Sequence, residues 1–360
     1  MSPAAVAFFV SPHGYGHAAR AAAVAEALVR RRPGLRPELF TSVPRWFFED
    51  SLTAPFGWHR ALTDVGLAQR SAVEEDLGAT ADRLAAFYPF ARSTVARLAR
   101  RVLELGCAAV VADISPLGIE VARRAGLPAV LVESFTWDWL YRAYPRAEPR
   151  LEAPADGFAE CFAAATLRLQ TEPLCRRVAG APRLPPISRR PRSGRAAVAA
   201  ALDLDPSRPL VVLHMGGFGW SWSEGEPAGD LRGAQIVAIG GVESPRREGR
   251  VLTLPHRPPV RMRDLTAAAD LVVAKLGYST VAEADASGTA LLHPARPTSP
   301  EYPFLARYVA ARLPSAEISV ELLAGGGWRE RAADLLAAPR PAPAVNGDEE
   351  AARAIDRLLG

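Results

Sequence analysis

The feature that most constrains this chain is a twofold alternation of short apolar segments with segments of helical periodicity. In the first half, apolar runs of strand length occupy residues 5–11, 36–41, 108–112 and 129–132. Between them, apolar side chains recur at helical spacing over residues 17–31, 81–105 and 116–125. Strands that alternate with helices pair in parallel through right-handed crossovers, so this half predicts a doubly wound sheet.

The same alternation returns in the second half of the chain. Strands are expected at residues 210–215, 234–239, 251–254, 270–275 and 290–293, and helices at 262–269 and 280–287. The stretch 181–195 holds four prolines and several arginines with almost no aliphatic periodicity, which is typical of a linker between domains. We therefore predict an α/β protein with Rossmann-like domains at 1–185 and 186–345, and a C-terminal helix at 346–360 that could pack back on the first domain.

Composition narrows the function classes. With 49% hydrophobic and 23% charged residues the chain is globular, and its net charge of +4 is spread without a basic block, so we expect no nucleic-acid partner. Three cysteines without CxxC spacing predict neither disulfides nor a zinc site. No apolar run approaches a membrane span, and the first apolar stretch lacks a basic leader. We expect a soluble, cytoplasmic protein without a transmembrane segment and leave peripheral membrane contact open.

The first motif follows the first predicted strand and runs from Ser11 to Arg20, with His13, Gly14, Gly16 and His17 between them. Ligands of open α/β sheets bind at the carboxyl ends of strands, where glycines let backbone approach a ligand and a helix N-terminus stabilises negative charge. An imidazole at this point could accept a proton from a hydroxyl group. The alternative is a tight strand-to-helix turn with a capping histidine, and the residues alone leave both interpretations open.

Two further glycine turns lie at the matching edge of the second predicted domain. His214 and Met215 are followed by Gly216 and Gly217, whose amides could hold a pyrophosphate. Lys275, the only lysine of the chain, opens the second turn. Helix N–H groups and hydroxyls could bind phosphate there, and a carboxylate one turn in could accept hydrogen bonds from both ribose hydroxyls. The second turn comprises Lys275, Leu276, Gly277, Tyr278, Ser279, Thr280, Val281, Ala282 and Glu283.

Local structure offers a simpler explanation of the second turn, because Thr280 and Glu283 have the spacing of a capping box and Ser279 or Thr280 could cap the helix. Capping and binding are compatible. The tripeptide from Asp203 to Asp205 precedes Pro206 in an expected loop, so we predict no metal site. Trp137 and Trp139 flank Asp138 and could either stack on a sugar ring or pack within a loop.

Together these motifs resemble the GT-B glycosyltransferase superfamily, and more closely the glycosyltransferase-like N-terminal region of plant L-arabinokinases. The matching stretches span most of the chain, which implies a GT-B fold with two Rossmann-like domains whose parallel sheets face a central cleft. The phosphate loop of the arabinokinase kinase half is missing, so sugar kinase activity is not implied. The matching stretches are 14–20, 111–116, 133–139 with Tyr141 and Tyr144, 275–283 and 301–304.

A more distant resemblance is to the N-acetylglucosaminyltransferase that forms lipid II. It implies that His17 is the base and that Glu283 holds the ribose. This sequence departs from that family after Gly217, where Phe218 and Gly219 lead to Trp220, and in the loop 297–301, which replaces a glutamine-rich donor-sugar pattern.

The resemblance implies an inverting, metal-independent glycosyltransferase without a cofactor, using a nucleotide-sugar, most simply a UDP-sugar, and a small-molecule, glycan or lipid acceptor. A nucleotide-sugar hydrolase with the same glycine-histidine loop and a noncatalytic nucleotide-sugar sensor are the alternatives. The predicted catalytic residues are His17, with Asp113 or Asp138 as the next candidates. The predicted donor contacts are Gly216, Gly217, Lys275, Gly277, Tyr278, Ser279, Thr280, Glu283 and Glu301. The predicted acceptor contacts are His13, Gly14, Gly16, Arg20, Glu133 and Trp137.

Overall fold

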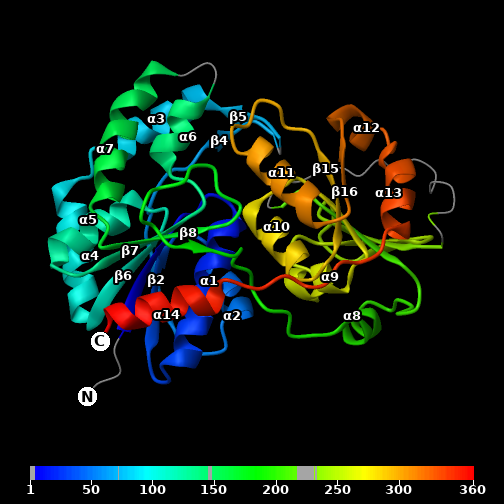
Figure 1. Cartoon of the computed structure of the whole chain (residues 1–360), viewed down its shortest axis with the longest axis horizontal. Coiled ribbons are helices and arrows are strands. Elements are labelled where there is room, and N and C mark those ends of the chain that lie inside the picture. The colour runs from blue at the N-terminus through cyan, green and yellow to red at the C-terminus, as the bar shows by residue number, and fades with distance from the viewer. Residues whose placement is uncertain (1–4, 72, 145–147, 217–230, 232) are drawn as a thin grey trace. The chain divides into compact units, whose positions relative to one another are not determined.

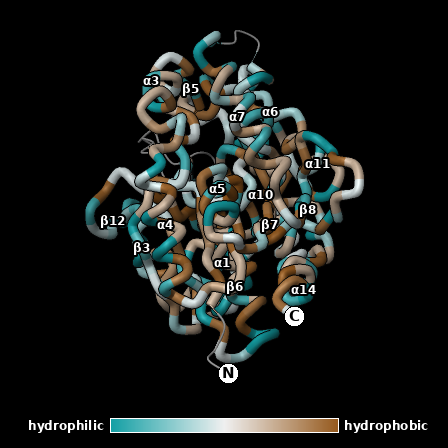
Figure 2. Tube along the Cα trace, turned by 90° about the vertical axis from the view of Figure 1, so that its left-hand side faces the viewer, coloured by the Kyte–Doolittle hydropathy of each residue, from teal (hydrophilic) through white to brown (hydrophobic). Residues whose placement is uncertain are grey.

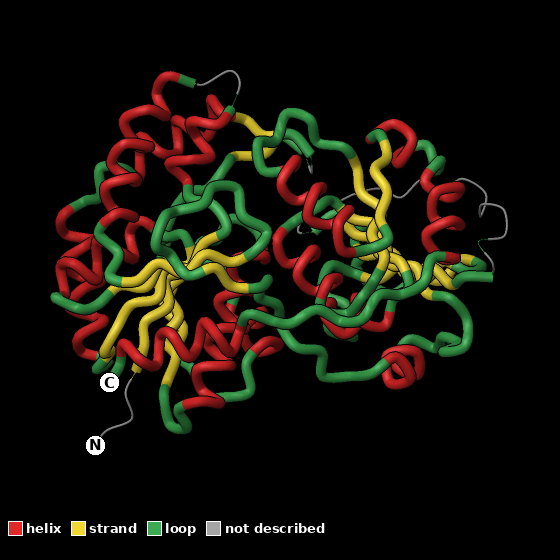
Figure 3. Tube along the Cα trace, in the orientation of Figure 1, coloured by secondary structure: helices red, strands yellow, loops and turns green. Residues whose placement is uncertain are grey.

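The computed structural model describes residues 5–71, 73–144, 148–216, 231 and 233–360. The chain forms two compact α/β units, each a central sheet with helices on both faces (Figure 1, Figure 3). Unit 1 comprises Met1–Arg70, Glu74–Ser188 and Asn346–Gly360, and unit 2 comprises Ser71–Val73 and Arg189–Val345. The predicted α/β class is confirmed. The chain passes from unit 1 to unit 2 between Ser188 and Arg189, which lie inside the proline-rich stretch.

The sheet of unit 1 is parallel throughout and has the strand order β3-β2-β1-β6-β7-β8-β9. The order reverses at β1, from which the chain runs outward first through β2 and β3 and then through β6. A small antiparallel pair, β4 and β5, lies apart from this sheet. The strands are β1 (Ala5–Val10), β2 (Arg36–Thr41), β3 (Gly57–Arg60), β4 (Ala68–Gln69), β5 (Glu75–Asp76), β6 (Cys107–Asp113), β7 (Ala129–Glu133), β8 (Leu167–Thr171) and β9 (Arg183–Leu184).

Helices cover both faces of this sheet because the central strands are apolar on both sides. Every residue of β1 is buried, and Val6, Phe8 and Val10 belong to one core cluster with α1, α2 and α14. Phe9 points to the opposite face, where it stacks on Phe40 and meets α5. The helices of unit 1 are α1 (Tyr15–Arg31), α2 (Arg45–Ser51), α3 (Leu77–Phe87), α4 (Arg92–Glu104), α5 (Pro116–Ala125), α6 (Trp137–Ala143), η1 (Pro149–Leu151), α7 (Glu152–Ala163) and α14 (Asp348–Leu358).

The single helix expected at 81–105 is wrong, because two helices, α3 and α4, occupy this stretch. The first ends at Phe87, and Tyr88 adopts an extended conformation before Pro89. A residue that precedes proline is sterically disfavoured in the helical region, and proline itself cannot donate to the helical ladder. The apolar periodicity continues through the break, which is why periodicity alone missed it.

The C-terminal helix α14 packs on α1 within unit 1 through an apolar face that includes Ala351 and Ile355. Its first turn carries three acids, so hydrophilic and hydrophobic residues both occur along the helix (Figure 2). Two ion pairs fix its register on α1, since Arg31 and Arg32 both contact Asp356 at 2.8 Å. The last helix of the chain therefore completes the first unit.

Unit 2 repeats the architecture with the strand order β12-β13-β11-β10-β14-β15-β16, in which the edge strand β12 is antiparallel and the others are parallel. One core cluster joins one face of the sheet to α8, α9, α10 and α11, and a second joins the other face to α12 and α13. The strands are β10 (Leu210–His214), β11 (Gln235–Ile239), β12 (Arg246–Glu248), β13 (Val251–Leu254), β14 (Leu271–Ala274), β15 (Ala290–Pro294) and β16 (Ser315–Ile318).

The helices of unit 2 are α8 (Arg195–Ala201), α9 (Met262–Ala268), α10 (Tyr278–Asp285), α11 (Tyr302–Arg312), α12 (Val320–Ala324) and α13 (Trp328–Ala337). Neither these nor the helices of unit 1, over the residues described, are long and apolar enough to cross a membrane.

A close contact between α5 and the sheet of unit 1 leads to a stability prediction. A Cβ atom added at Gly118 on α5 would lie 2.5 Å from the Cβ of Phe9 and 3.3 Å from that of Ala112. We expect Gly118→Ala to lower the free energy of unfolding by about 1–3 kcal/mol through overpacking, as measured by urea denaturation. The matched control is Gly78→Ala on α3, where the new Cβ makes an ordinary contact at 3.5 Å and alanine favours the helix. Equal stability of the two variants would contradict this account.

Candidate functional site

The turn after β1 places His17 in the first turn of α1. Gly14, at the helix N-cap, has φ 71°, a conformation that other L-residues rarely adopt, so the turn depends on glycine at this position. The Ser11 hydroxyl accepts a hydrogen bond from the backbone N–H of His13 at 3.3 Å. This geometry brings the predicted base to the carboxyl edge of the sheet, where β6 and β7 also end.

A buried polar network surrounds His17. Its Nδ1 lies 2.8 Å from Oδ1 of Asp113, the last residue of β6. Arg20, one helical turn after His17, donates two hydrogen bonds to the same carboxylate. Its Nε lies 2.8 Å from Oδ2, and its Nη2 lies 2.7 Å from Oδ1. The remaining Arg20 nitrogen, Nη1, donates to Ser134 at 3.0 Å, and Ser134 donates to the Thr171 carbonyl. The network thus joins four segments distant in the sequence.

Electrostatics sets the protonation states of this network. Burial alone would raise the pKa of Asp113, but the charge and hydrogen bonds of Arg20 outweigh it, so the pKa of this carboxyl is lowered. Burial lowers the pKa of His17 below its ordinary 6.5, and Asp113 only partly opposes this. The ionised Asp113 accepts a hydrogen bond from the Nδ1–H group of a neutral His17. The lone pair on Nε2 is then the proton acceptor of the ring.

Aromatic rings form the walls around the imidazole. The His17 ring lies 5.9 Å from the Phe135 ring and 6.2 Å from the Trp137 ring, and Trp137 also meets His13 edge-on at 5.3 Å. Trp137 is completely buried and stacks on Tyr141, so of the two interpretations offered by the sequence the structure shows packing. Contact of Trp137 with an acceptor stays a prediction.

Two predicted acids lie near this edge without touching His17. Glu133 is buried at the end of β7, where it accepts a hydrogen bond from Gln170 at 2.9 Å, and burial raises its pKa. Asp138, in the first turn of α6, is buried and lies 3.5 Å from both Arg142 and Arg176. Among the candidate acids, Asp113 is the one hydrogen-bonded to the imidazole.

The glycine turns of unit 2 bring their predicted residues to the carboxyl edge of the second sheet. Gly216, with φ 70°, follows β10, and a Cβ there would lie 3.8 Å from Cε of Lys275, the residue that follows β14. Burial and the Lys275 charge lower the pKa of His214 to about 4. Lysine and the first glycine of the loop therefore lie together, while Gly217 and the aromatic residues after it lie outside the described residues.

The start of α10 differs from the expected capping box. The N-cap is Gly277, and Ser279 and Thr280 are inside the helix, so the expected side-chain cap is wrong and the described structure has none at this end. Helical geometry begins at Tyr278 because the preceding glycine adopts the extended cap conformation. The N–H groups in the first turn of a helix can bind an anion.

Glu283 has a partner that the sequence did not suggest. Its Oε1 lies 3.0 Å from Nε and 2.9 Å from Nη2 of Arg189, and both side chains are buried. Arg189 belongs to the stretch interpreted as a linker, and an arginine among others there gave no signal of a site. Glu301, the last predicted donor contact, is the half-buried N-cap residue of α11.

The described residues contain no group of three or more His, Cys, Asp or Glu that could hold a metal ion. Asp205 of the DxD tripeptide instead accepts hydrogen bonds from Ser207.

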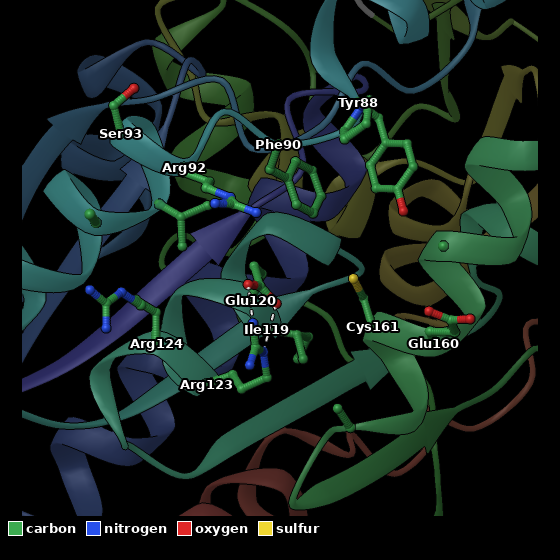
Figure 4. A pocket seen from close by; sticks show the side chains of 15 residues that line it. Tyr88, Phe90, Arg92, Ser93, Ile119, Glu120, Arg123, Arg124, Glu160 and Cys161 are labelled. Carbon is green, nitrogen blue, oxygen red and sulfur yellow. Dashed lines mark hydrogen bonds and ion pairs between the residues drawn. The ribbon is translucent and has the colours of Figure 1, made fainter.

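A cavity of about 920 Å³ in unit 1 lies among α4, α5 and α7 (Figure 4). Its lining contains no predicted site residue. Arg123 there is paired with Glu120, and burial raises the pKa of the Cys161 thiol to about 11. The cavity lining therefore supplies no activated nucleophile, in contrast to the His17 network.

No protein-family model matches. The chain is 27% identical over 367 residues to L-arabinokinase of Arabidopsis thaliana, an alignment that covers 96% of this chain and 33% of the relative, so it spans about a third of that protein's length.

Solved structures match along the whole chain. The glycosyltransferase of kitacinnamycin is 17% identical with a TM-score of 0.60, covering 100% of both chains. UGT2 of Phytolacca americana, complexed with UDP-2fluoro-glucose and pterostilbene, is 15% identical with a TM-score of 0.54, covering 99% of both. At these identities the likeness shows the fold, and the predicted GT-B fold class is confirmed.

The network predicts how His17 titrates. We expect NMR titration to place its imidazole pKa below 6.5, with the proton on Nδ1 in the neutral ring. Asp113→Asn should lower that pKa further, because the hydrogen bond and the negative charge of the Asp113 carboxylate raise it. His293 in unit 2, whose pKa burial lowers to about 4, is the internal control and should not move. A rise in the His17 pKa in this variant would contradict the assignment.

Proposed function

Because the chain has the GT-B fold, we propose that it is a glycosyltransferase that moves a sugar from a nucleotide-sugar, most simply a UDP-sugar, to an acceptor hydroxyl. The observation that carries the proposal is the buried pair of His17 and Asp113, with Arg20 holding the carboxylate. A neutral imidazole whose Nδ1 is fixed by a carboxylate is suited to general base catalysis at Nε2. The complexed relative with UDP-2fluoro-glucose supports the choice of donor class.

In the proposed step, Nε2 of His17 takes the proton of the acceptor hydroxyl as the oxygen attacks the anomeric carbon of the donor. The bond from that carbon to the diphosphate breaks, and the nucleoside diphosphate leaves with the electron pair. Attack opposite the leaving group inverts the anomeric centre. Asp113 stabilises the imidazolium that forms, since its own pKa is held low by Arg20.

The donor would be bound by unit 2. The first-turn N–H groups of α10, the amide of Gly216 and the ammonium of Lys275 are groups that stabilise a diphosphate without requiring a metal. Glu283 is the proposed ribose ligand, and its ion pair with Arg189 holds its orientation. Unit 1, with His13, Gly14 and Gly16 beside the base, would bind the acceptor.

The direct test is incubation of the protein with a panel of UDP-, GDP- and dTDP-sugars, with and without candidate acceptors. Sugar transfer that persists in EDTA supports the proposal. Donor hydrolysis that acceptors do not alter would favour a nucleotide-sugar hydrolase, and tight donor binding without turnover would favour a sensor.

Substitution of a single residue should separate the effect on turnover from the effect on donor binding. His17→Ala is expected to lower turnover by about a hundredfold or more while UDP affinity, measured by calorimetry, changes little. His59→Ala, which removes a half-buried histidine of unit 1 that is also paired with a carboxylate, serves as the matched control and should keep turnover. Near-normal turnover of His17→Ala would transfer the role of base to Asp113 or Asp138.

The donor assignment rests on Glu283 and its partner. Glu283→Gln should weaken UDP binding by about tenfold, because a neutral amide accepts the ribose hydroxyls less strongly. Arg189→Gln should also weaken it, since it leaves Glu283 buried without its cation. Glu330→Gln, an exposed acid of α13, is the control. Calorimetry that shows unchanged UDP affinity in both site variants would exclude this ribose assignment.

A further inference from the structure

Asp64 is a buried carboxyl group that the proposed reaction does not use. It follows β3 on the segment that leads to β4, and none of its surface is exposed. Its Oδ1 accepts a hydrogen bond from the Ser11 hydroxyl at 3.0 Å. Ser11 is the first residue after β1, so Asp64 contacts the turn that carries His13 and Gly14 into α1.

The segment around Asp64 is connected to that turn at several further points. The Leu67 amide donates to Nδ1 of His13 at 3.3 Å, and a Cβ at Gly66 would lie 2.5 Å from the same His13 atom. Tyr141 of α6 donates to the Gly66 carbonyl at 3.1 Å. Loss of the bond between Asp64 and Ser11 would therefore loosen the turn that leads into His17.

The surroundings of Asp64 contain hydrogen-bond donors but no paired cation in the described chain. Its Oδ2 and the Trp137 indole Nε1 both lack a close hydrogen-bond partner among the residues described, so the stabilising effect of Trp137 on the carboxylate acts over a longer distance. Asp113, by contrast, has Arg20. A second carboxylate beside Asp113 would be buried without compensation.

The titratable and charged groups around Asp64 come from three elements. His13 and His17, with Arg20, come from the turn and α1, Asp113 comes from β6, and Tyr141 with Tyr144 comes from α6 and its end. Burial, together with the negative charge of Asp113, raises the pKa of Asp64 to about 8, although Ser11, Trp137 and Gly66 oppose the shift. At neutral pH the group is largely protonated.

We propose that Asp64 is a positioning residue, a neutral carboxylic acid that holds the Ser11 turn in place and so orients His17. Its ionisation would place a second negative charge next to Asp113 and disturb the network that His17 shares with Arg20. In the active arrangement, Asp113 is therefore charged and Asp64 is neutral.

Stability measurements test the neutral state independently of the proposed function. A carboxyl whose pKa rises from 3.8 unfolded to about 8 folded makes the folded protein progressively less stable as pH increases between these values. The side chain of Asp64→Asn cannot ionise. The melting temperature of this variant relative to that of the wild type should therefore rise from pH 5 to pH 8, and this gap should stay constant at higher pH. In the control Asp76→Asn, a half-buried acid whose pKa the Ala79 amide lowers, the gap should stay constant over that range. A constant gap for Asp64→Asn would overturn the neutral state.

The positioning role, which rests on the proposed function, is tested by sugar transfer. Asp64→Ala should lower kcat by about tenfold or more, with UDP affinity unchanged, because Ser11 loses its acceptor. Asp64→Asn keeps an acceptor oxygen and should restore most of that loss, and its kcat should lack the decline that the wild type shows above pH 8. Wild-type kcat in Asp64→Ala, or an alkaline decline that persists in Asp64→Asn, would overturn the positioning role. If no variant transfers sugar, the wild type included, the proposed function fails while the stability result stands.

Discussion

The interior of unit 1 depends on a carboxylate that is buried in a place where an unpaired charge would be strongly unfavourable. Asp113 ends β6 with 2% of its surface exposed, and an isolated charge there would cost several kcal/mol. Arg20 compensates it with two charge-assisted hydrogen bonds and passes a third to Ser134. Because Arg20 and His17 share one face of α1, the same pairing fixes the helix on the sheet and the imidazole on the carboxylate. Fold stability and the candidate chemistry thus rest on one interaction.

Each unit has a buried ion pair that involves a residue predicted for the site, but the two pairs differ in kind. In unit 1 the network leaves His17 neutral and Asp113 ionised, which suits proton transfer. In unit 2 the buried pair of Arg189 and Glu283 lies among groups suited to a diphosphate and a ribose, near an uncapped helix start. Parallel strands bring side chains to one edge because every crossover returns the chain in the same direction. The repeated fold therefore provides two candidate sites with different groups.

Much of this arrangement could be predicted because its signals are local. Glycine at position 14 and the histidine three residues later lie within one turn, and the apolar runs of β1, β6 and β10 are visible as patterns. Predictions failed where two local signals conflicted. The periodicity of 81–105 hid the break at Pro89, and the spacing of Thr280 and Glu283 suggested a cap although Gly277 begins the helix. In both cases a backbone preference outweighed a side-chain pattern.

The sequence by itself determined the α/β class, the two repeated halves and the glycine turns that end their strands, since these depend on residues close together in the chain. Only the tertiary structure decided which acid touches His17, which cation pairs with Glu283, and that Asp64 lies beneath the Ser11 turn. These pairs are 96, 94 and 53 residues apart. The physical reason is burial, because a charge's pKa and its partner depend on how much water the folded chain excludes, which no local pattern encodes.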